Sequence, residues 1–326
     1  MSAFPQTFLV SSDSPGTVLA ELRRQLPGQS WSEVRRLLRA RYVAVNGVLC
    51  LDEGRRLTNG ETISVSTRPF SAPPTENDVA IKYTDRQLVI VEKPSGMTTL
   101  RRTSDRSWPA SRRLRQPALD ECVPRLIARH AAKRSRTRLR QRLPRLWPVH
   151  RIDRDTSGLL VFARTETAQQ ALIQQFAEHK AVRKYLCLVP GTLVDQTVQS
   201  QLIRDRGDGR RGSSPDTTIG QPATTHIRTL RQLGAFTELE CTLETGRTHQ
   251  IRIHLAELGH PVCGDIRYRG PFGQPETADF SGAPRLALHA AVLRVCHPES
   301  DDLLDFETSW PADMQRFLNR LRADSS

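Results

Sequence analysis

The stretch "VHRIDRDTSGLLVFART", residues 149–165, sets a dense group of charged side chains directly before an apolar run. Asp153 lies between Arg151 and Arg154, and His150 precedes them. The residues Thr-Ser-Gly then lead into "LLVFA", a short apolar run that is typical of a buried strand. A strand that only had to fold would not need these charges at its entrance. The stretch therefore predicts a functional corner where a loop meets a core strand.

An aspartate at such a corner is suited to acid–base or nucleophilic chemistry. Nearby arginines stabilise the charged form of a carboxylate, so Asp153 is expected to stay ionised. An ionised carboxylate can act as a nucleophile or as a base. For a lone aspartate in a basic loop, a salt-bridged structural role is the simpler interpretation, so further segments must be considered.

A second segment, "GRTHQIRIHLAELGHPVCGD" at residues 246–265, gathers polar side chains. Its dense part contains Arg247, Thr248, His249, Gln250, Arg252 and His254. If a helix begins near Thr248, its first turn offers backbone N–H groups together with side-chain donors. The two histidines lack an H-E-x-x-H pattern, so no metal site is predicted here.

The overall charge favours a polyanionic partner. The 326 residues carry a formal net charge of +13, and only five of the 48 basic residues are lysines. Residues 101–145 hold 15 basic side chains against three acidic ones. A genome-wide preference for arginine would explain the ratio of arginine to lysine, but not this clustering. Arginine suits phosphate and stacking contacts, so the charge pattern predicts contact with nucleic acid.

The sequence also bears on the compartment. No apolar run reaches the ~18 residues of a membrane helix, and the N-terminus lacks the basic start of a secretory leader. Six cysteines are scattered without a C-x-x-C pair, which predicts free thiols in a reducing compartment. We therefore expect a cytoplasmic protein with no membrane and no metal partner.

Periodicity and turn signals predict two domains. After a loose arm over residues 1–15, two amphipathic helices and an Asn-Gly hairpin fill residues 16–68. The second helix opens with a capping box, and its polar side carries Arg35, Arg36, Arg39 and Arg41. Residues 69–78 have the composition of a linker. Over residues 79–315 strands and helices mix without regular βαβ alternation, which predicts an α+β fold.

Three segments resemble the motifs of RluA-type RNA pseudouridine synthases. "HRIDRDTSGLLVFART" resembles H-R-L-D-x-x-T-S-G-L-L-V, and "RKYLCLVPG" resembles K-x-Y-x-A-x-V-x-G. The third segment, "LETGRTHQIRIHLAELGHPVCGD" at residues 243–265, resembles L-x-T-G-R-x-H-Q-I-R-x-H. "LVIVEKPSGM", "ATTHIRTL" and "LALHAAVLRVCHP" extend the resemblance. It implies an isomerase that converts uridine to pseudouridine without a cofactor. The implied catalytic domain has a mixed, largely antiparallel sheet, flanking helices and a central RNA-binding cleft.

The resemblance also implies roles for individual residues. Asp153 would be the catalytic aspartate, acting after the target base is flipped out, and Tyr185 would pack against that base. Arg252 would pair with Asp153, with Arg247 as the second choice for this pair. The residues implied in substrate binding are Arg151, which would help to extrude the base, and His150, Thr156, Arg247, His249 and Gln250.

The N-terminal part resembles a ribosomal-protein-S4-like RNA-binding domain, which uses its basic helix to hold structured RNA. This favours large-subunit ribosomal RNA over transfer RNA as the substrate, and we expect a monomer. The chain departs from the family pattern where Ile152 replaces leucine and where Arg183 replaces lysine. The basic segment 101–145 is also longer than the pattern.

Two other hypotheses stay open from the residues alone. A non-catalytic RNA-binding or ribosome-assembly factor could keep this fold, although intact Asp153, Tyr185 and Arg252 argue against it. A glycosidase could use Asp153 and Asp155 as its carboxylate pair. Residues two apart in an extended segment are too close for an inverting pair, but a retaining separation near ~5 Å is possible.

Overall fold

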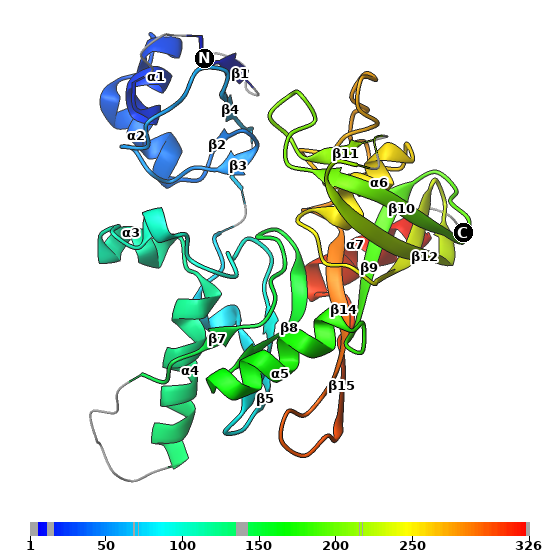
Figure 1. Cartoon of the computed structure of the whole chain (residues 1–326). Helices are drawn as coiled ribbons and strands as arrows, with labels where there is room; N and C mark the ends of the chain where they lie inside the picture. The colour runs from blue at the N-terminus through cyan, green and yellow to red at the C-terminus, as the bar shows by residue number, and fades with distance from the viewer. Residues whose placement is uncertain are drawn as a thin grey trace. The chain divides into compact units, whose positions relative to one another are not determined.

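The chain forms two compact units in a computed structural model. The structure describes residues 6–11, 16–67, 69–70, 72–134, 143–214, 216 and 218–323. Unit 1 comprises residues 1–73 and 108–116, and unit 2 comprises residues 74–107 and 117–326. Both units are drawn in Figure 1. Residues 135–142 of the basic segment 101–145 lie outside the described residues.

Unit 1 is a small α/β module. Its four-stranded sheet has the order β1-β4-β2-β3, with β1 at Gln6–Leu9, β2 at Val43–Val45, β3 at Val48–Leu49 and β4 at Thr62–Val65. Helices α1 (Val18–Gln25) and α2 (Trp31–Arg39) supply apolar faces to its core, and α3 spans Ala110–Arg115. The core is formed by side chains such as Leu22, Leu38 and Ile63, which are fully buried.

Local signals of the sequence explain most of this module. Ser30 and Glu33 form the predicted capping box of α2, with Ser30 N donating to Glu33 Oε2 at 2.7 Å. Asn46 and Gly47 have φ values of 50° and 70°, as the predicted two-residue hairpin turn requires. The expectation of a loose arm over residues 1–15 was wrong for β1. This strand pairs antiparallel with β4, and Val10 after it is fully buried.

Unit 2 is built on one large, mostly antiparallel sheet. Within its described residues the sheet has 11 strands, with the path β11-β10-β12-β13-β9-β14-β8-β6-β5, β15 beside β14, and β7 beside β8. The strands are β5 (Ala80–Thr84), β6 (Leu88–Lys93), β7 (Trp147–Pro148), β8 (Ser157–Ala163), β9 (Val182–Pro190), β10 (Gln196–Ile203), β11 (Gly212–Ser214), β12 (Gln221–Leu233), β13 (Phe236–Leu243), β14 (Leu288–Cys296) and β15 (Leu303–Glu307). The predicted α+β class is confirmed. Strand β11 was not predicted from the sequence.

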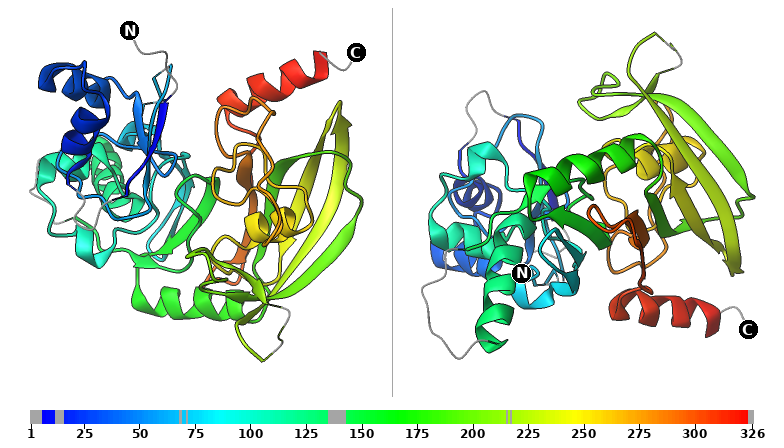
Figure 2. Two further views of the ribbon diagram at one scale, coloured as in Figure 1. Left: turned by 90° about the horizontal axis from the view of Figure 1, so that it is seen from above. Right: turned by 60° about the horizontal axis from the view of Figure 1, so that its bottom comes forward.

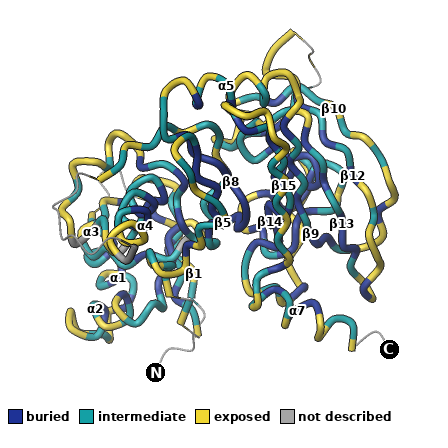
Figure 3. Tube along the Cα trace, turned by 90° about the horizontal axis from the view of Figure 1, so that it is seen from below, coloured by how far each residue is buried: buried dark blue, intermediate teal, exposed yellow. Residues whose placement is uncertain are grey.

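Four helices flank this sheet: α4 (Leu119–Arg134), α5 (Glu166–Ala177), α6 (Gln250–Glu257) and α7 (Ala312–Ala323). Helix α5 runs along β8 and β14 (Figure 1). Helix α6 lies against the sheet near β12 (Figure 2), and its His254 Nδ1 bonds to Thr225 Oγ1 at 2.9 Å. Buried residues concentrate on β8, β9 and β14 (Figure 3), so the centre of the sheet is the core.

The predicted functional stretch enters this core at a tight junction. Strands β8 and β14 pair in parallel at Ser157 with His289 and at Gly158 with Ala290. Gly158 has φ of 120°, and a Cβ there would lie 2.2 Å from Ala290 O. Only glycine fits this close approach without displacing the backbone. The glycine of the Thr-Ser-Gly sequence is thus required by the contact between two central strands.

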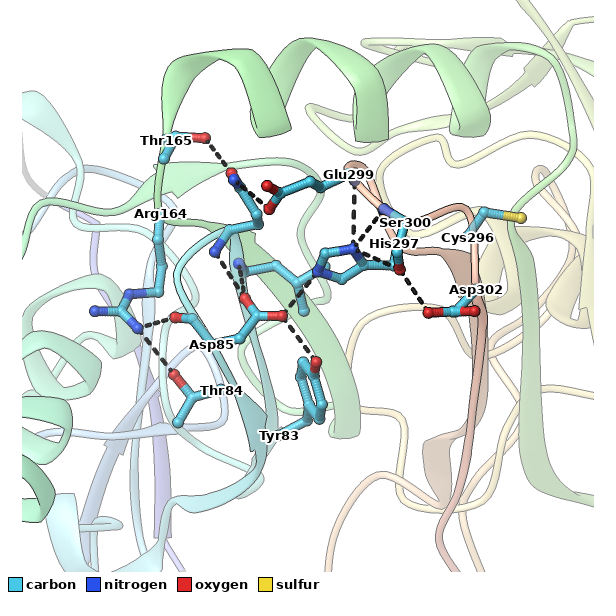
Figure 4. Close-up of polar contacts among 12 residues, drawn as sticks. Tyr83, Thr84, Asp85, Arg164, Thr165, Cys296, His297, Glu299, Ser300 and Asp302 are labelled. Atoms are coloured by element: carbon cyan, nitrogen blue, oxygen red, sulfur yellow. Dashed lines mark hydrogen bonds and ion pairs between the residues drawn. The ribbon is translucent and has the colours of Figure 1, made fainter.

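A polar cluster joins the turn after β5 to the turn after β14 (Figure 4). His297 Nε2 bonds to Asp85 Oδ2 at 2.8 Å, and Asp85 Oδ2 also accepts from Tyr83 OH at 2.8 Å. His297 Nδ1 accepts the backbone N–H of Ser300 at 3.1 Å. The residue types resemble a hydrolytic triad, but Ser300 Oγ donates to Asp302 Oδ2 at 2.6 Å. The cluster therefore holds two turns together.

Candidate active site

Asp153 lies on a turn whose backbone is fastened by the segment after β6. Thr99 Oγ1 donates to Ile152 O at 2.7 Å, and Ser95 Oγ donates to Asp155 O at 2.6 Å. Gly96 N donates to Arg154 O at 2.8 Å. Carbonyl groups on both sides of Asp153 are thus bonded to one neighbouring loop. This arrangement limits how far the Asp153 side chain can move.

Lys93 also binds the backbone of the Asp153 turn. Its Nζ, on a fully buried side chain, donates to Arg154 O at 2.9 Å, Met97 O at 2.8 Å and Pro94 O at 3.0 Å. An ammonium group has three donors, and here all three are used. Burial lowers the pKa of Lys93 to about 7, while the charges of Asp155 and Asp153 act to raise it. Lys93 therefore orders the Asp153 turn through its bonds to these three carbonyl groups.

Arg252, in the first turn of α6, connects two carboxylates. Its Nη1 donates to Asp153 Oδ2 at 3.3 Å, and its Nε and Nη2 donate to Asp265 at 2.7 Å and 2.9 Å. The Asp265 side chain is fully buried, whereas 16% of the Asp153 side chain is exposed. Burial lowers the pKa of Arg252, but Asp265 and Asp153 outweigh this effect and raise it. The two carboxylates therefore keep Arg252 charged, and Asp265 holds the Arg252 guanidinium beside the partly exposed Asp153.

His249 stands beside the same aspartate. Its Nε2 lies 3.8 Å from Asp153 Oδ2, and its Nδ1 bonds to Tyr268 OH at 2.7 Å. The residue has φ of 62°, a left-handed conformation that directs the start of α6. Burial lowers the pKa of His249 to about 4, although the Asp153 charge acts to raise it. His249 is therefore neutral at physiological pH and is a polar neighbour of Asp153.

Tyr185 reaches the site from β9, and Thr156 from the Asp153 turn. Tyr185 is 7% exposed, and its hydroxyl makes no hydrogen bond within the described part of the chain. Burial raises the pKa of this hydroxyl, Arg183 lowers it, and the Asp153 charge raises it further. Thr156 N donates to Asp153 O at 3.2 Å, while its buried Oγ1 has no partner among the described residues. Both hydroxyls thus lack a hydrogen-bond partner among the described residues.

The other predicted residues have different surroundings. Arg151 is exposed and has no bonding partner in the described residues. His150 Nε2 accepts from Val161 N at 3.2 Å, and burial lowers the His150 pKa to about 3. Arg247 Nε donates to Pro222 O at 3.1 Å, so Arg252, the first choice, makes the ion pair with Asp153.

Gln250 is 2% exposed and bonds entirely within the protein. Its Oε1 accepts from Thr245 Oγ1 at 2.8 Å and from Arg247 N at 3.1 Å. Its Nε2 donates to Thr224 O at 2.9 Å and to Thr225 Oγ1 at 3.0 Å. The amide therefore holds the loop before α6 against β12.

The predicted RNA-binding arginines line α2 of unit 1. Arg35 and Arg39 share Glu53, with Nε to carboxylate distances of 2.7 Å and 3.3 Å. Arg36 is exposed, and no partner is described for it. Arg41 follows the helix with φ of 68°. Glu53 neutralises only part of the charge of these arginines, so this side of α2 is positively charged.

Sequence reasoning did not assign roles to Asp265, Lys93, Ser95 or Thr99. Asp265 stands at the end of the quoted segment 246–265, but nothing in its spacing indicates a bond to Arg252. Lys93 does offer a signal, because a lysine closing an apolar strand before Pro-Ser-Gly is an unusual buried charge. The two hydroxyl residues have no distinctive pattern.

No group of three or more histidine, cysteine, aspartate or glutamate side chains in the described ranges could hold a metal ion. In the same ranges, the helices include none long and apolar enough to cross a membrane. The arrangement around Asp153 thus comprises a partly exposed carboxylate, an anchored arginine and hydroxyl groups without a hydrogen-bond partner among the described residues. Such a set can carry out nucleophilic or proton-transfer chemistry with side chains alone.

Comparison with known proteins gives this arrangement a family. Residues 87–257 match the family model described as RNA pseudouridylate synthase. The chain belongs to the RNA pseudouridine synthase family. It is therefore an isomerase that converts uridine in RNA to pseudouridine. The matched residues include Asp153, Tyr185 and Arg252.

Relatives of this pseudouridine synthase extend over most of the chain. The "Ribosomal large subunit pseudouridine synthase D" of Nitrosomonas europaea is 34% identical over 311 residues, covering 92% of this chain and 83% of the relative. The protein with the same description from Xanthomonas campestris is 35% identical and covers 83% and 78%. Among solved structures, "Human RNA Pseudouridylate Synthase Domain Containing 4" has a TM-score of 0.56 at 21% identity, covering 74% of this chain and 93% of that chain, and supports the fold.

Proposed function

We propose that this pseudouridine synthase isomerises specific uridines in large-subunit ribosomal RNA. Relatives named "Ribosomal large subunit pseudouridine synthase D" match more than nine-tenths of the chain at about one-third identity. The excess of arginine, with a net charge of +13, supports a large polyanionic substrate. The observation that most supports the chemistry is the Asp153–Arg252–Asp265 arrangement.

Asp153 is the catalytic residue in this proposal. Its carboxylate is partly exposed, and its Oδ1 accepts no hydrogen bond from the described residues, so one oxygen is available to the nucleotide. The bond between N1 of uracil and C1′ of the ribose breaks, and a bond between C5 and C1′ forms. The proton on C5 leaves, and N1 gains one, so substrate and product are isomers. The reaction needs no redox partner and no group donor.

The surrounding residues prepare the nucleotide for this exchange. The target base is flipped out of its stack into a cleft at Asp153, at a cost of a few kcal/mol. Tyr185 packs against the flipped base, and Arg151 fills the space that the base leaves. Arg252 holds the Asp153 carboxylate toward the sugar through its hydrogen bond to Oδ2. His150, Thr156, His249, Arg247 and Gln250 shape the binding site, the last two through the loop before α6.

Unit 1 acts as an S4-like RNA-binding domain in this proposal. The sequence assigns residues 16–68 to this domain, residues 69–78 to a linker and residues 79–315 to the catalytic domain. Strand β1 (Gln6–Leu9) adds an N-terminal strand to the first domain. Arg35, Arg36, Arg39 and Arg41 contact the RNA backbone, supported by their position on one side of α2 and the loop after it. The enzyme works as a monomer in the cytoplasm.

The proposal is tested by mapping pseudouridine in ribosomal and transfer RNA from cells with and without the gene. Loss of a defined site in large-subunit ribosomal RNA, restored by the wild type but not by Asp153→Asn, is the expected result. Asparagine keeps the size of the side chain and removes its charge, so the variant should fold and bind RNA normally. In vitro, its kcat should fall by at least about 10³-fold.

Two outcomes would contradict the proposal in different ways. If cells without the gene lose a pseudouridine from transfer RNA instead, the reaction stands but the substrate is transfer RNA. Restoration of the ribosomal site by Asp153→Asn would remove Asp153 from the catalytic role. Thermal unfolding of the purified variant serves as the control for folding.

A further inference from the structure

Arg183 is a buried cation without a carboxylate partner. Among the residues that the structure describes, four arginines are buried, and Arg183 is 8% exposed. It forms no ion pair with any described residue. The other three approach a carboxylate within 4.0 Å: Arg101 with Glu121, Arg252 with Asp265, and Arg269 with Asp279.

The hydrogen bonds of Arg183 leave most of its donors unused. Nη2 donates to Glu244 O at 3.2 Å, and the guanidinium lies over the Phe176 ring at 5.0 Å. Nε is buried without a partner, and Nη1 likewise has no acceptor in the described ranges. Two of the three nitrogen atoms therefore have no hydrogen-bond partner.

Arg183 borders the candidate active site. It stands two residues before Tyr185 on β9, and the alternation of a strand puts both side chains on one face. Burial raises the pKa of the Tyr185 hydroxyl, and the Arg183 and Asp153 charges act on it in opposite directions. The Phe176 ring beneath Arg183 also stacks with His150, at 4.7 Å between centroids. Arg183 thus lies close to the segment that carries Asp153.

Gly246 leaves room for the guanidinium. A Cβ at this exposed glycine would lie 2.4 Å from Arg183 Nη1. Its φ is not in the left-handed region, so the backbone itself does not demand glycine here. The space is needed because the guanidinium of Arg183 occupies it. Gly246 therefore keeps Nη1 next to the surface of the loop before α6.

A buried charge without a partner is costly, so an unpaired buried arginine at the edge of a site is a candidate to bind a ligand that supplies the opposite charge. The anionic group of RNA is the backbone phosphate, which a guanidinium binds with several donors at once. We propose that Arg183 binds a backbone phosphate of the RNA beside the target nucleotide, at the opening left by Gly246. This inference rests on the proposed function in that it takes RNA to bind around Asp153.

The salt dependence of RNA binding tests this assignment. Binding of a large-subunit ribosomal RNA transcript is measured across KCl concentrations for the wild type, Arg183→Met and Arg183→Lys. One lost phosphate contact should reduce the slope of log affinity against log salt by about 0.7–0.9 in Arg183→Met. Arg183→Lys keeps the charge and should keep most of the slope. An unchanged slope in Arg183→Met would overturn the proposal.

Two controls separate binding from folding and from general charge. Arg294→Gln removes an exposed arginine of β14 that pairs with Asp305, and it should leave the slope unchanged. The Tm of Arg183→Met should not fall, because the substitution removes a buried charge that has no carboxylate partner. A large fall in Tm with an unchanged slope would assign Arg183 a structural role instead.

Gly246→Ala provides an independent variant. In the wild-type background, the added methyl group should displace the Arg183 guanidinium and weaken RNA binding. In the Arg183→Met background, the same substitution should cause no additional loss of RNA affinity. Equal losses in both backgrounds would contradict the proposal. Binding does not require turnover, so an enzyme that binds this transcript without modifying it would contradict the proposed function alone.

Discussion

At the scale of single residues, two aspartates share one arginine and differ in exposure. Asp265 accepts two short hydrogen bonds from Arg252 and is fully buried. Asp153 accepts one bond of 3.3 Å and is partly exposed. Asp265 therefore fixes the direction of the guanidinium, while Asp153 keeps one oxygen without a hydrogen-bond partner among the described residues. Asp265 is a positioning residue that acts through Arg252.

Replacing Asp265 with asparagine should loosen this arrangement. The Arg252 fork would lose its ionic anchor, and small misplacements of reacting groups cost about 10²-fold in rate. We expect kcat of Asp265→Asn to fall by about 10- to 100-fold, with RNA affinity within a few-fold of the wild type. Single-turnover kinetics and RNA binding measure the two quantities separately.

The matched control is Asp279→Asn in the same loop. Asp279 accepts from Gly264 N at 2.6 Å and lies outside the Arg252 arrangement. Its substitution should change kcat little. Equal effects of the two substitutions would show that the loop, rather than the bond to Arg252, determines the rate.

At the scale of secondary-structure elements, the junction of β8 and β14 positions the Asp153 turn. The strands approach so closely at Gly158 that a side chain there would meet the Ala290 backbone. Ser157 Oγ also bonds to His289 Nδ1 at 2.9 Å across the junction. The start of β8 is thus held against β14 by two contacts. These contacts limit the movement of the turn that precedes β8.

Gly158→Ala should therefore be strongly destabilising. Both the left-handed φ and the overlap with Ala290 O contribute, for an expected loss of at least about 3 kcal/mol in the free energy of unfolding. Gly259 also has a positive φ but has no atom within 4 Å of a built Cβ. Gly259→Ala should cost only about 1 kcal/mol in urea unfolding. Similar losses for the two variants would rule out the strand contact as the cause.

Helix α2 offers a separate test of the proposed RNA-binding domain. Arg36 and Arg39 lie on its charged side, and each phosphate contact contributes about 0.7–0.9 to the salt slope. The double variant Arg36→Gln and Arg39→Gln should lower the slope by about 1.5 while kcat at saturating RNA is retained. Arg24→Gln, on α1 and paired with Glu21, is the control within the same unit. A slope that stays at the wild-type value would remove α2 from the RNA contacts.

At the scale of the whole molecule, burial of histidine predicts sensitivity to acid. Burial lowers the pKa of His249, His254 and His289 to about 4 and that of His150 to about 3, from an ordinary value of 6.5. Between these values the unfolded chain binds protons that the folded chain does not. The free energy of unfolding therefore falls as pH decreases from about 6.5 to about 4.

Each buried histidine should contribute up to about 1.4 kcal/mol per pH unit to this fall. Urea unfolding across this pH range should give a shallower slope for His289→Gln than for the wild type. His130→Gln on α4 removes an exposed histidine and should leave the slope unchanged. If His289→Gln has the wild-type slope, protonation of buried histidine is not the cause of acid unfolding.

Much of the fold was predictable because its signals are local. The capping box at Ser30, the hairpin at Asn46-Gly47 and the strand after Gly158 depend on neighbours a few residues away. Strand β1 was missed because β4, with which it pairs, lies more than fifty residues along the chain. β11 was missed because its three residues have the composition of a loop.

The sequence by itself determined the α+β class and the motifs that identify the family, and it named Asp153, Tyr185 and Arg252 for the site. Charge, periodicity and motif order are properties of the chain, so they can be read without coordinates. Only the tertiary structure decided that Arg252 rather than Arg247 reaches Asp153, that Asp265 anchors it, and that Arg183 has no carboxylate partner. These facts depend on distances between segments far apart in the chain, which are fixed by the packing of the sheet.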